Sequence, residues 1–448
     1  MEKNCSVTRR RFLGGTLGAG AALTPLFHIV PRSVLGGPGH TPPSEKLRIA
    51  CVGCGGKGNV DVKGVSTEVL VAFCDVDDKR AAQTFKAHPE VPRYKDFREM
   101  LDKEEKNIDA VTVTVPDHMH APIALRAMAM GKHVFVQKPL THTVEEARLM
   151  QEAARKHKLA TQMGIQGHSS EGIRLYREWI EAGAIGTVKE IHIWTNRPIW
   201  PQGLDRPEQE DPIPETLDWD LWLGVAPTRP FYAGYVPFKW RGWFDFGTGA
   251  LGDMGCHQLD AAFWTFDLGM PKRVELVGMD ASYTETYPKW SILRFHFPAK
   301  GKRPAVALTW YDGKKLPPRP DELDPKRKMG DGGQLIYGTD GILFTGGSAS
   351  SPRLIPETKM QEFLATKPEK KYPRVKDHYQ DWIEACKGGR AAGANFNYAG
   401  PLTQTVLLGN VALRVGRTIE WDAKKRQVTN VPEANQLLRT EYREEFAL

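Results

Sequence analysis

A glycine-rich turn directly after a buried strand is the feature that most constrains how this chain can fold. Residues 47–52 form an apolar run, residues 53–58 read Gly-Cys-Gly-Gly-Lys-Gly, and a helical stretch follows. Gly53 permits a tight turn, Gly55 lets a pyrophosphate approach the backbone, and Gly58 allows the helix to pack closely on the strand. The helix N-terminus adds free N–H groups and a partial positive charge. This context predicts a dinucleotide site whose binding residues are Gly53, Gly55, Gly56, Lys57 and Gly58.

An acidic residue follows the second apolar run at the distance that a dinucleotide site requires. Asp75 comes directly after residues 69–74 and lies 22 positions beyond Gly53. An acid at this place receives the hydroxyls of the adenosine ribose. Its charge favours NAD, because it would repel the 2′-phosphate of NADP, whereas the nearby cations Lys79 and Arg80 leave NADP open.

Short β-branched runs alternate with helical stretches as far as residue 165. The strand-like runs fall at 47–52, 69–74, 109–115, 133–136 and 159–163. Strands that alternate with helices in this way are joined by right-handed crossovers. The first part of the chain is therefore predicted to form a parallel, doubly wound sheet.

The pattern changes from residue 166 onward. A helix ends at Gly183, a Pro- and Trp-rich passage extends to Trp243, and longer strands and two late helices follow. The strands are expected at 188–194, 273–279, 291–297, 305–311 and 334–337, and the helices at 378–387 and 401–415. Since 448 residues exceed one ordinary domain, we expect an α/β protein with two domains. A Rossmann domain covers 44–165, and a substrate and oligomerisation domain of α+β type, with a large and mostly antiparallel open sheet, covers 166–448.

The first 43 residues have the features of a targeting segment. Residues 8–13 read Thr-Arg-Arg-Arg-Phe-Leu, which resembles the twin-arginine export signal, and a weakly apolar run and a Pro/Gly-rich linker follow. The apolar run is interrupted by Pro25 and is shorter than the ~20 residues of a membrane-spanning helix. We predict a periplasmic protein exported by the twin-arginine route, which would touch the membrane only through an uncleaved signal.

Charge and cysteine usage argue against several other classes of protein. The chain has 61 basic and 54 acidic side chains, but no basic stripe interleaved with aromatic residues, and we expect no nucleic-acid partner. Cys51 and Cys54 have the Cys-x-x-Cys spacing that also occurs in zinc sites and in redox-active sites. They fall in a strand and in the glycine turn, so small buried thiols are the favoured interpretation. We expect no metal site.

Two polar turns lie at the ends of the third and fourth predicted strands, where ligands bind in parallel sheets. Residues 116–120 read Pro-Asp-His-Met-His, and residues 137–139 read Gln-Lys-Pro. Together with the glycine turn, these segments resemble the signatures of the Gfo/Idh/MocA family, which includes glucose–fructose oxidoreductase and inositol dehydrogenase. That family typically has Glu-Lys-Pro, whereas this chain has Gln137. An amide can form hydrogen bonds but supplies no counter-charge.

The resemblance implies roles for the residues of both turns. It implies that Lys138 reaches the nicotinamide ribose and a substrate hydroxyl, and it allows a cis peptide before Pro139. For His120 we favour capping of the next helix over chemistry. The resemblance further implies that the cofactor contacts Pro116, Asp117, His120 and Gln137.

An acid and a histidine four positions apart form the strongest signal in the second domain. On a helix, Asp253 and His257 share one face. They match the Asp-x-x-x-His of the family, which implies that His257 is the acid/base and that Asp253 orients it or the substrate. Oxidising a carbinol requires removal of the hydroxyl proton, and histidine titrates near neutrality. Lys138 would stabilise the developing alkoxide. A buried structural histidine beside a helix-capping acid is the alternative.

Other polar and aromatic residues are weaker candidates for substrate contacts. His168 follows the strand that closes the Rossmann domain, and Asn196, Arg197 and Trp243 lie in the Trp-rich passage. Indole rings stack on the C–H faces of sugars but pack into cores equally well.

Three functions are compatible with these residues. The first is an NAD(P)-dependent oxidoreductase that transfers hydride between nicotinamide and a secondary hydroxyl of a sugar or polyol. The second is redox-neutral cleavage of a glycoside through a transient keto-sugar, and the third is a non-catalytic sugar-binding member of the family. Since the periplasm holds no free nicotinamide pool, an exported enzyme needs a tightly bound cofactor. The resemblance also implies a homodimer or homotetramer.

Overall fold

The computed structural model describes residues 45–366 and 368–446. The predicted signal and linker, residues 1–43, lie outside the described residues. From Leu47 onward the chain forms a single unit. Within the described part, no helix is long and apolar enough to cross a membrane.

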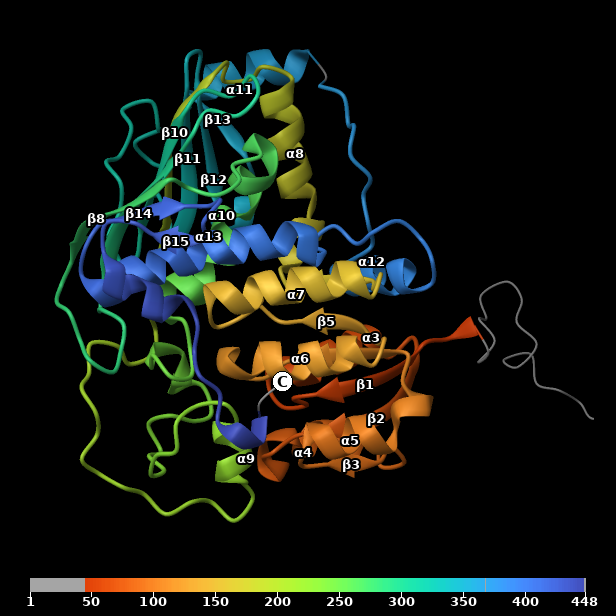
Figure 1. Cartoon of the computed structure of the whole chain (residues 1–448). Helices are drawn as coiled ribbons and strands as arrows, with labels where there is room; N and C mark the ends of the chain where they lie inside the picture. Colours follow the sequence, from red (N-terminus) through yellow and green to blue (C-terminus); the bar gives the residue numbers. More distant parts are fainter. Residues whose placement is uncertain (1–44, 367, 447–448) are drawn as a thin grey trace, which may run out of the picture. The chain divides into compact units, whose positions relative to one another are not determined.

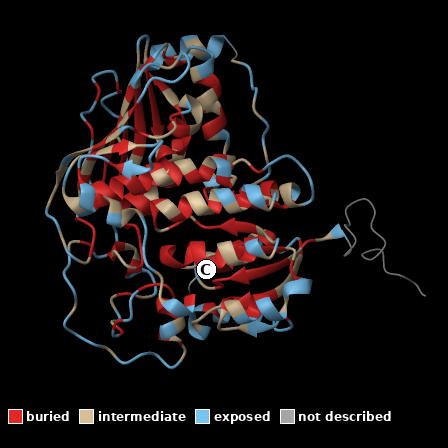
Figure 2. Cartoon of the chain, viewed as in Figure 1, coloured by how far each residue is buried: buried red, intermediate tan, exposed pale blue. Residues whose placement is uncertain are grey.

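Six parallel strands form the first sheet, in the order β3-β2-β1-β4-β5-β6. The strands are β1 (Arg48–Val52), β2 (Val69–Cys74), β3 (Arg93–Tyr94), β4 (Ala110–Val113), β5 (His133–Val136) and β6 (Thr161–Met163). The helices between them are α3 (Lys57–Val65), α4 (Asp78–Ala87), α5 (Phe97–Lys103), α6 (His120–Ala129) and α7 (Val144–Lys156). Both β1 and β4 are buried almost throughout, as strands covered by helices on both faces must be (Figure 2). The predicted doubly wound sheet is confirmed.

A second sheet of nine strands follows, in the order β13-β12-β11-β7-β10-β9-β8-β14-β15. Its strands are β7 (Val188–Thr195), β8 (Arg273–Met279), β9 (Ser291–Phe297), β10 (Val306–Tyr311), β11 (Gly332–Gly338), β12 (Ile342–Gly346), β13 (Arg353–Ile355), β14 (Ile419–Asp422) and β15 (Gln427–Val428). Every pairing is antiparallel except that of β7 with β10. This agrees with the mostly antiparallel sheet expected from the sequence.

The helices of the second part are α8 (Glu171–Glu181), α9 (Trp219–Leu223), α10 (Gly249–Phe266), α11 (Glu357–Ala365), α12 (His378–Cys386) and α13 (Phe396–Val415). Figure 1 shows α13 running beside α7, so a helix of the second part packs directly on the Rossmann layer. Helix α13 begins five residues before the expected start at Pro401. Pro401 cannot donate to the carbonyl of Asn397, which instead accepts a hydrogen bond from Gln151 at 3.3 Å.

Helix α12 returns to the Rossmann sheet and completes one of its apolar layers. Trp382 is fully buried with Ile383 and Tyr379 in the same cluster as Phe73 and Phe135. The rings of Phe135 and Trp382 meet edge to face, with their centres 5.7 Å apart. The core of the first sheet therefore depends on residues more than two hundred positions beyond its last strand.

Shortening Trp382 tests this dependence. Because its side chain is 0% exposed, Trp382→Ala leaves a cavity under the sheet, and we expect the free energy of unfolding to fall by about 3–5 kcal/mol. Urea denaturation followed by circular dichroism measures it. A loss below about 1 kcal/mol would show that α12 is dispensable for the Rossmann core.

Candidate functional site

The glycine turn has no room for side chains. Gly53 has φ +79°, and a Cβ on it would lie 2.1 Å from the carbonyl oxygen of Thr114. A Cβ on Gly58 would lie 2.0 Å from the carbonyl oxygen of Gly53, which is the close helix-on-strand packing expected for this position. The predicted roles of both glycines agree with this geometry.

Asp75 holds the glycine turn as well as facing the adjoining cavity. Its carboxylate accepts hydrogen bonds from the backbone N–H groups of Cys54 at 2.7 Å and Gly55 at 3.2 Å. Burial raises the pKa of Asp75, although these backbone hydrogen bonds oppose the shift. A carboxylate has about four acceptor positions, so Asp75 can bind the turn and still accept from ribose hydroxyls.

A cavity of about 610 Å³ lies at the carboxyl ends of the parallel strands and extends toward the second part of the chain. We call it the cleft. The residues predicted from sequence that line it are Gly53, Gly55, Lys57, Asp75, Pro116, Asp117, Gln137, Lys138, Arg197 and Asp253. Sequence analysis thus located one side of the cleft from local motifs alone.

The residues at the turn fit a dinucleotide. The N-terminus of α3 has no side-chain cap and no acid in its first turn, so the positive end of its dipole favours an anion there. Arg80 lies over the turn, since a Cβ on Gly56 would come 2.2 Å from its guanidinium. The pyrophosphate of NAD would thus meet backbone donors and a cation, with Asp75 at the ribose end.

Lys138 and Asp253 join the two parts of the chain across the cleft. The Lys138 Nζ donates to Asp253 Oδ1 at 2.6 Å and to the Asp253 carbonyl oxygen at 2.9 Å. Arg241 Nε donates to the same Oδ1 at 3.0 Å. The peptide bond between Lys138 and Pro139 is cis, as the resemblance allowed. An ammonium has three donors, so one N–H of Lys138 remains for a ligand.

The electrostatics of this cluster keep the acid charged and the imidazole neutral. Burial alone would raise the pKa of Asp253, but the charges of Lys138 and Arg241 lower it to about 2. Desolvation, followed by the charge of Lys138, lowers the pKa of His257 to about 3. His257 lies one helical turn after Asp253 on α10, is half-buried, and is not among the residues that line the cleft. At neutral pH it is an unprotonated imidazole that can accept a proton.

The turn at residues 116–120 anchors helix α10. Asp117 Oδ2 accepts from the Thr248 hydroxyl at 2.6 Å, directly before the first residue of α10, and burial raises the pKa of Asp117 to about 7. His120 does not line the cleft, because it is buried with its ring nitrogens 2.8 Å from the Pro139 carbonyl and 3.0 Å from the Val115 carbonyl. It ties two cleft loops together.

Gln137 is held by a buried carboxylate that the sequence did not indicate. Its Nε2 donates to Asp61 Oδ2 at 2.8 Å. Asp61 is 0% exposed and also accepts from Lys57 Nζ at 2.6 Å, from the Tyr379 hydroxyl at 2.6 Å and from the Thr114 hydroxyl at 2.7 Å. The amide of Gln137 can donate to this carboxylate, whereas an ionised glutamate at position 137 could only accept.

Three of the weaker substrate candidates lie away from the cleft. His168 is buried with its Nδ1 2.8 Å from Asp260 Oδ1. Trp243 is 1% exposed and packs against Tyr235. Asn196 accepts from Arg197 at 2.6 Å and does not line the cleft. Of these weaker candidates, only Arg197 reaches it.

Other residues of the cleft were missed by sequence reasoning. Trp222 lines it without any sequence signal for a binding role, whereas Trp200 and Trp240, which also line it, belong to the Trp-rich passage from which aromatic contacts were expected. Arg241 pairs with Asp253 but sits in a short 3-10 turn without a recognisable motif. No metal-binding cluster of His, Cys, Asp or Glu occurs in the part of the chain that the structure describes.

Family models match nearly all of the chain after its first 46 residues. The model for an oxidoreductase family with an NAD-binding Rossmann fold matches residues 47–165, and the model for its C-terminal alpha/beta domain matches residues 187–448. The chain belongs to the Gfo/Idh/MocA family. The resemblance inferred from the glycine turn, Lys138 and Asp253 is confirmed at the level of the family.

Curated relatives of this Gfo/Idh/MocA protein include sugar and polyol dehydrogenases. The levoglucosan dehydrogenase of Pseudarthrobacter phenanthrenivorans is 27% identical over 37% of this chain and 35% of its own length. The inositol 2-dehydrogenase of Salmonella typhimurium is 27% identical over 33% of this chain and 45% of its own length. The matched stretches thus span less than half of these relatives.

A solved structure extends the likeness in fold to both domains. The WlbA dehydrogenase of Bordetella pertussis, solved in complex with NADH and UDP-GlcNAcA, matches with a TM-score of 0.59 at 17% identity, over 84% of this chain and 99% of that one. The likeness shows that the chain shares its overall fold with that structure.

Exchanging the acid and the amide at positions 61 and 137 tests their pairing. Gln137→Glu puts a second carboxylate next to Asp61, at the place where the amide nitrogen now lies 2.8 Å from Asp61 Oδ2. We expect the pKa of one of the two carboxyl groups to rise and kcat to fall at least tenfold at neutral pH. Asp61→Asn leaves Lys57 without its counter-charge. The double variant Asp61→Asn/Gln137→Glu restores one acid and one amide.

The measurement is the pH profile of turnover for all three variants. Recovery of most of the activity and of the parental profile in the double variant supports the pairing. If the double variant shows the summed loss of the two single variants, the residues act independently of each other.

Proposed function

We propose that the protein is an exported oxidoreductase that moves hydride between the nicotinamide of a tightly bound NAD and a secondary hydroxyl of a sugar or polyol. The observation that carries this proposal is the ion pair of Lys138 with Asp253 in the cleft, which leaves one ammonium N–H for a hydroxyl oxygen. The names of the curated relatives support the substrate class.

The residues that would hold the cofactor lie on one side of the cleft. Gly53, Gly55 and the N-terminus of α3 would receive the pyrophosphate, Asp75 the adenosine ribose, and Lys138 the nicotinamide ribose. When bound there, NAD supplies the hydride acceptor. The charge of Asp75 favours NAD, whereas the cation Arg80 over the glycine turn leaves NADP as the alternative. A binding assay that compares the two cofactors decides between them.

The proton and the charge are handled by residues of the chain. Lys138 Nζ donates a hydrogen bond to the substrate hydroxyl oxygen and stabilises its developing negative charge. His257, which is unprotonated at neutral pH, takes the hydroxyl proton on a ring nitrogen. Asp253 holds the ammonium through Oδ1, and Arg241 fixes that carboxylate.

Substitutions of the two proposed catalytic residues test this division of roles. We expect Lys138→Met and His257→Ala each to lower kcat about 10²–10⁴-fold. In the proposed mechanism Asp253 positions Lys138, so Asp253→Asn should chiefly lower kcat, because the Lys138 ammonium loses its ion pair and is no longer held in place. Steady-state kinetics by NADH absorbance measures both. Unchanged kcat in His257→Ala would assign the proton transfer to another group.

The lowered pKa of His257 predicts an unusual acid limit. With a pKa of about 3, the imidazole becomes protonated only well below pH 5. The kcat/KM for oxidation, measured from initial rates, should therefore not fall near pH 6.5 through protonation of His257. Any fall in that range should persist in His257→Ala. A titration near pH 6.5 removed by that substitution would contradict the desolvated state of His257.

Native mass spectrometry followed by a sugar and glycoside panel tests the proposed function as a whole. Purified protein should carry NAD at about one per chain, and a free sugar or polyol should reduce it. Aglycone release from a glycoside without net NADH would instead assign redox-neutral cleavage. Sugar binding without turnover, unchanged in Lys138→Met, would leave a binding protein.

A further inference from the structure

The adenosine end of the cleft lies at β2 and β3, on the opposite side of the glycine turn from Lys138. Asp75 follows β2 and residues 95–97 follow β3, whereas Lys138 follows β5. Asp75 and residues 95–97 line the cleft. With the pyrophosphate at the glycine turn and the adenosine ribose at Asp75, the adenine ring would lie beyond Asp75, toward residues 95–97.

Residues 216–222, which we call the α9 segment, are attached to this end of the Rossmann domain. Asp77 and Leu217 form an isolated antiparallel bridge. Beside it, the Asp218 N–H donates to the Val76 carbonyl at 2.9 Å. A piece of the second part of the chain thus lies along the loop that follows β2.

The C-terminal turn, residues 443–446, joins the α9 segment to the Rossmann domain a second time. Arg443 forms an ion pair with Asp220 of α9 at 2.6 Å. On the other side, Arg98 of α5 donates to the Glu445 carbonyl at 2.6 Å. Figure 1 shows the dark blue C-terminal turn beside α9.

Phe446 is the side chain of the C-terminal turn that lines the cleft. The guanidinium carbons of Arg98 and Arg443 lie 4.2 Å and 5.1 Å from the centre of its ring, within the range of cation–π interactions. Both cations are paired with acids, Arg98 with Asp96 of the Rossmann domain and Arg443 with Asp220 of α9. Phe446 is therefore held by cations that are anchored on both walls of the adenosine end.

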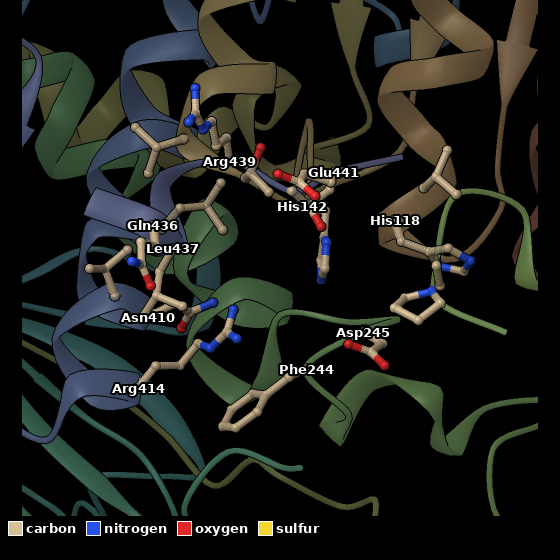
Figure 3. A pocket seen from close by; sticks show the side chains of 18 of the residues that line it. His118, His142, Phe244, Asp245, Asn410, Arg414, Gln436, Leu437, Arg439 and Glu441 are labelled. Carbon is tan, nitrogen blue, oxygen red and sulfur yellow. The ribbon is translucent and has the colours of Figure 1, made fainter. Parts of the chain in front are cut away.

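The chain immediately before the C-terminal turn is also fixed. Leu437, Arg439 and Glu441 line a second cavity, of about 600 Å³, together with residues of α13 (Figure 3). The Tyr442 hydroxyl then donates to Glu146 of α7 at 2.6 Å. The turn is therefore placed by its neighbours on α7 and α13 as well as by its own contacts.

The lining of the adenosine end suits an adenine ring. Its apolar side chains come from the Rossmann domain, the α9 segment and the C-terminal turn, and they are Val76, Phe97, Leu217, Leu221 and Phe446. Pockets for small molecules are lined mainly by apolar and aromatic side chains. An adenine ring has two apolar faces to bury against such a lining.

We propose that the α9 segment and the C-terminal turn enclose the adenosine half of NAD, and that Phe446 retains it there. The inference rests on the proposed function, which supplies the dinucleotide. It assigns retention of the cofactor to contacts at the opposite end of the cleft from Lys138 and Asp253. NAD leaves when the turn separates from α9, so the pair of Arg443 with Asp220 and the packing of Phe446 slow its release.

Exchange of bound NAD for an excess of isotopically labelled NAD, followed by native mass spectrometry of the full chain, tests the proposal. Phe446→Ala removes the ring from the wall of the cleft, and Arg443→Ala removes the ion pair with Asp220. We expect each substitution to raise the rate constant of exchange at least about tenfold. Phe446→Leu keeps a large apolar side chain and should exchange NAD at close to the parental rate.

Three further variants show whether the effect belongs to this closure. Arg417→Ala removes an exposed ion pair with Glu433, neither of which lines the cleft, and should leave the exchange rate unchanged. Phe446→Ala/Arg443→Ala should accelerate exchange by less than the product of the two single effects, because both residues act through one contact. Phe446→Ala/Lys138→Met should show the product, since Lys138 would contact the other half of the cofactor.

Failure of the closure and failure of the proposed function give different results. Exchange at the parental rate in Phe446→Ala, with an unfolding midpoint that shows a folded protein, would overturn the closure alone. If Phe446→Ala does not fold, the same result in Arg443→Ala is decisive. An acceleration in Arg417→Ala as large as in Arg443→Ala would also overturn the closure. Parental protein that neither carries nor takes up NAD would overturn the proposed function, and the closure with it.

Discussion

The ion pair between Lys138 and Asp253 is the interaction on which the rest of the site depends. One partner follows a strand of the Rossmann sheet, and the other lies on α10 of the second part. Both side chains are largely buried, and removing either would leave a charge without its partner, which commonly costs 3–5 kcal/mol. The pair therefore fixes the relative placement of the two walls of the cleft, and its electrostatics keep Asp253 ionised and His257 neutral.

The supports of this pair extend outward through buried polar contacts. Arg241 holds Asp253, while Asp61 holds Gln137 next to Lys138. Tyr379 on α12 donates to Asp61, so a helix near the end of the chain contributes to the side of the cleft that holds Gln137 and Lys138. The same helix buries Trp382 in the Rossmann core. Stability and the positioning of the cleft residues are thus carried by shared elements.

The sequence predicted what local patterns encode. Gly53 and Gly58 stand in a strand–turn–helix context that has one steric solution, and the apolar runs predicted five of the six strands of the first sheet and five of the nine of the second. Contacts between distant segments had no such signal. Asp61 meets Gln137 across 76 positions and Tyr379 across 318, and each residue alone is an ordinary polar side chain. Trp243 packs in the core while Trp222 lines the cleft, an outcome that sequence could not decide because indole rings suit cores and ligand surfaces equally. The export signal at residues 8–13 stays a prediction.

A crystal structure with bound NADH and a sugar substrate would show whether Lys138 contacts the reacting hydroxyl. We expect the Lys138 Nζ to lie at hydrogen-bond distance, about 2.7–3.2 Å, from the hydroxyl oxygen on the carbon facing the nicotinamide, while it keeps its contact with Asp253. A reacting carbon that lies next to neither Lys138 nor His257 would contradict the proposed mechanism.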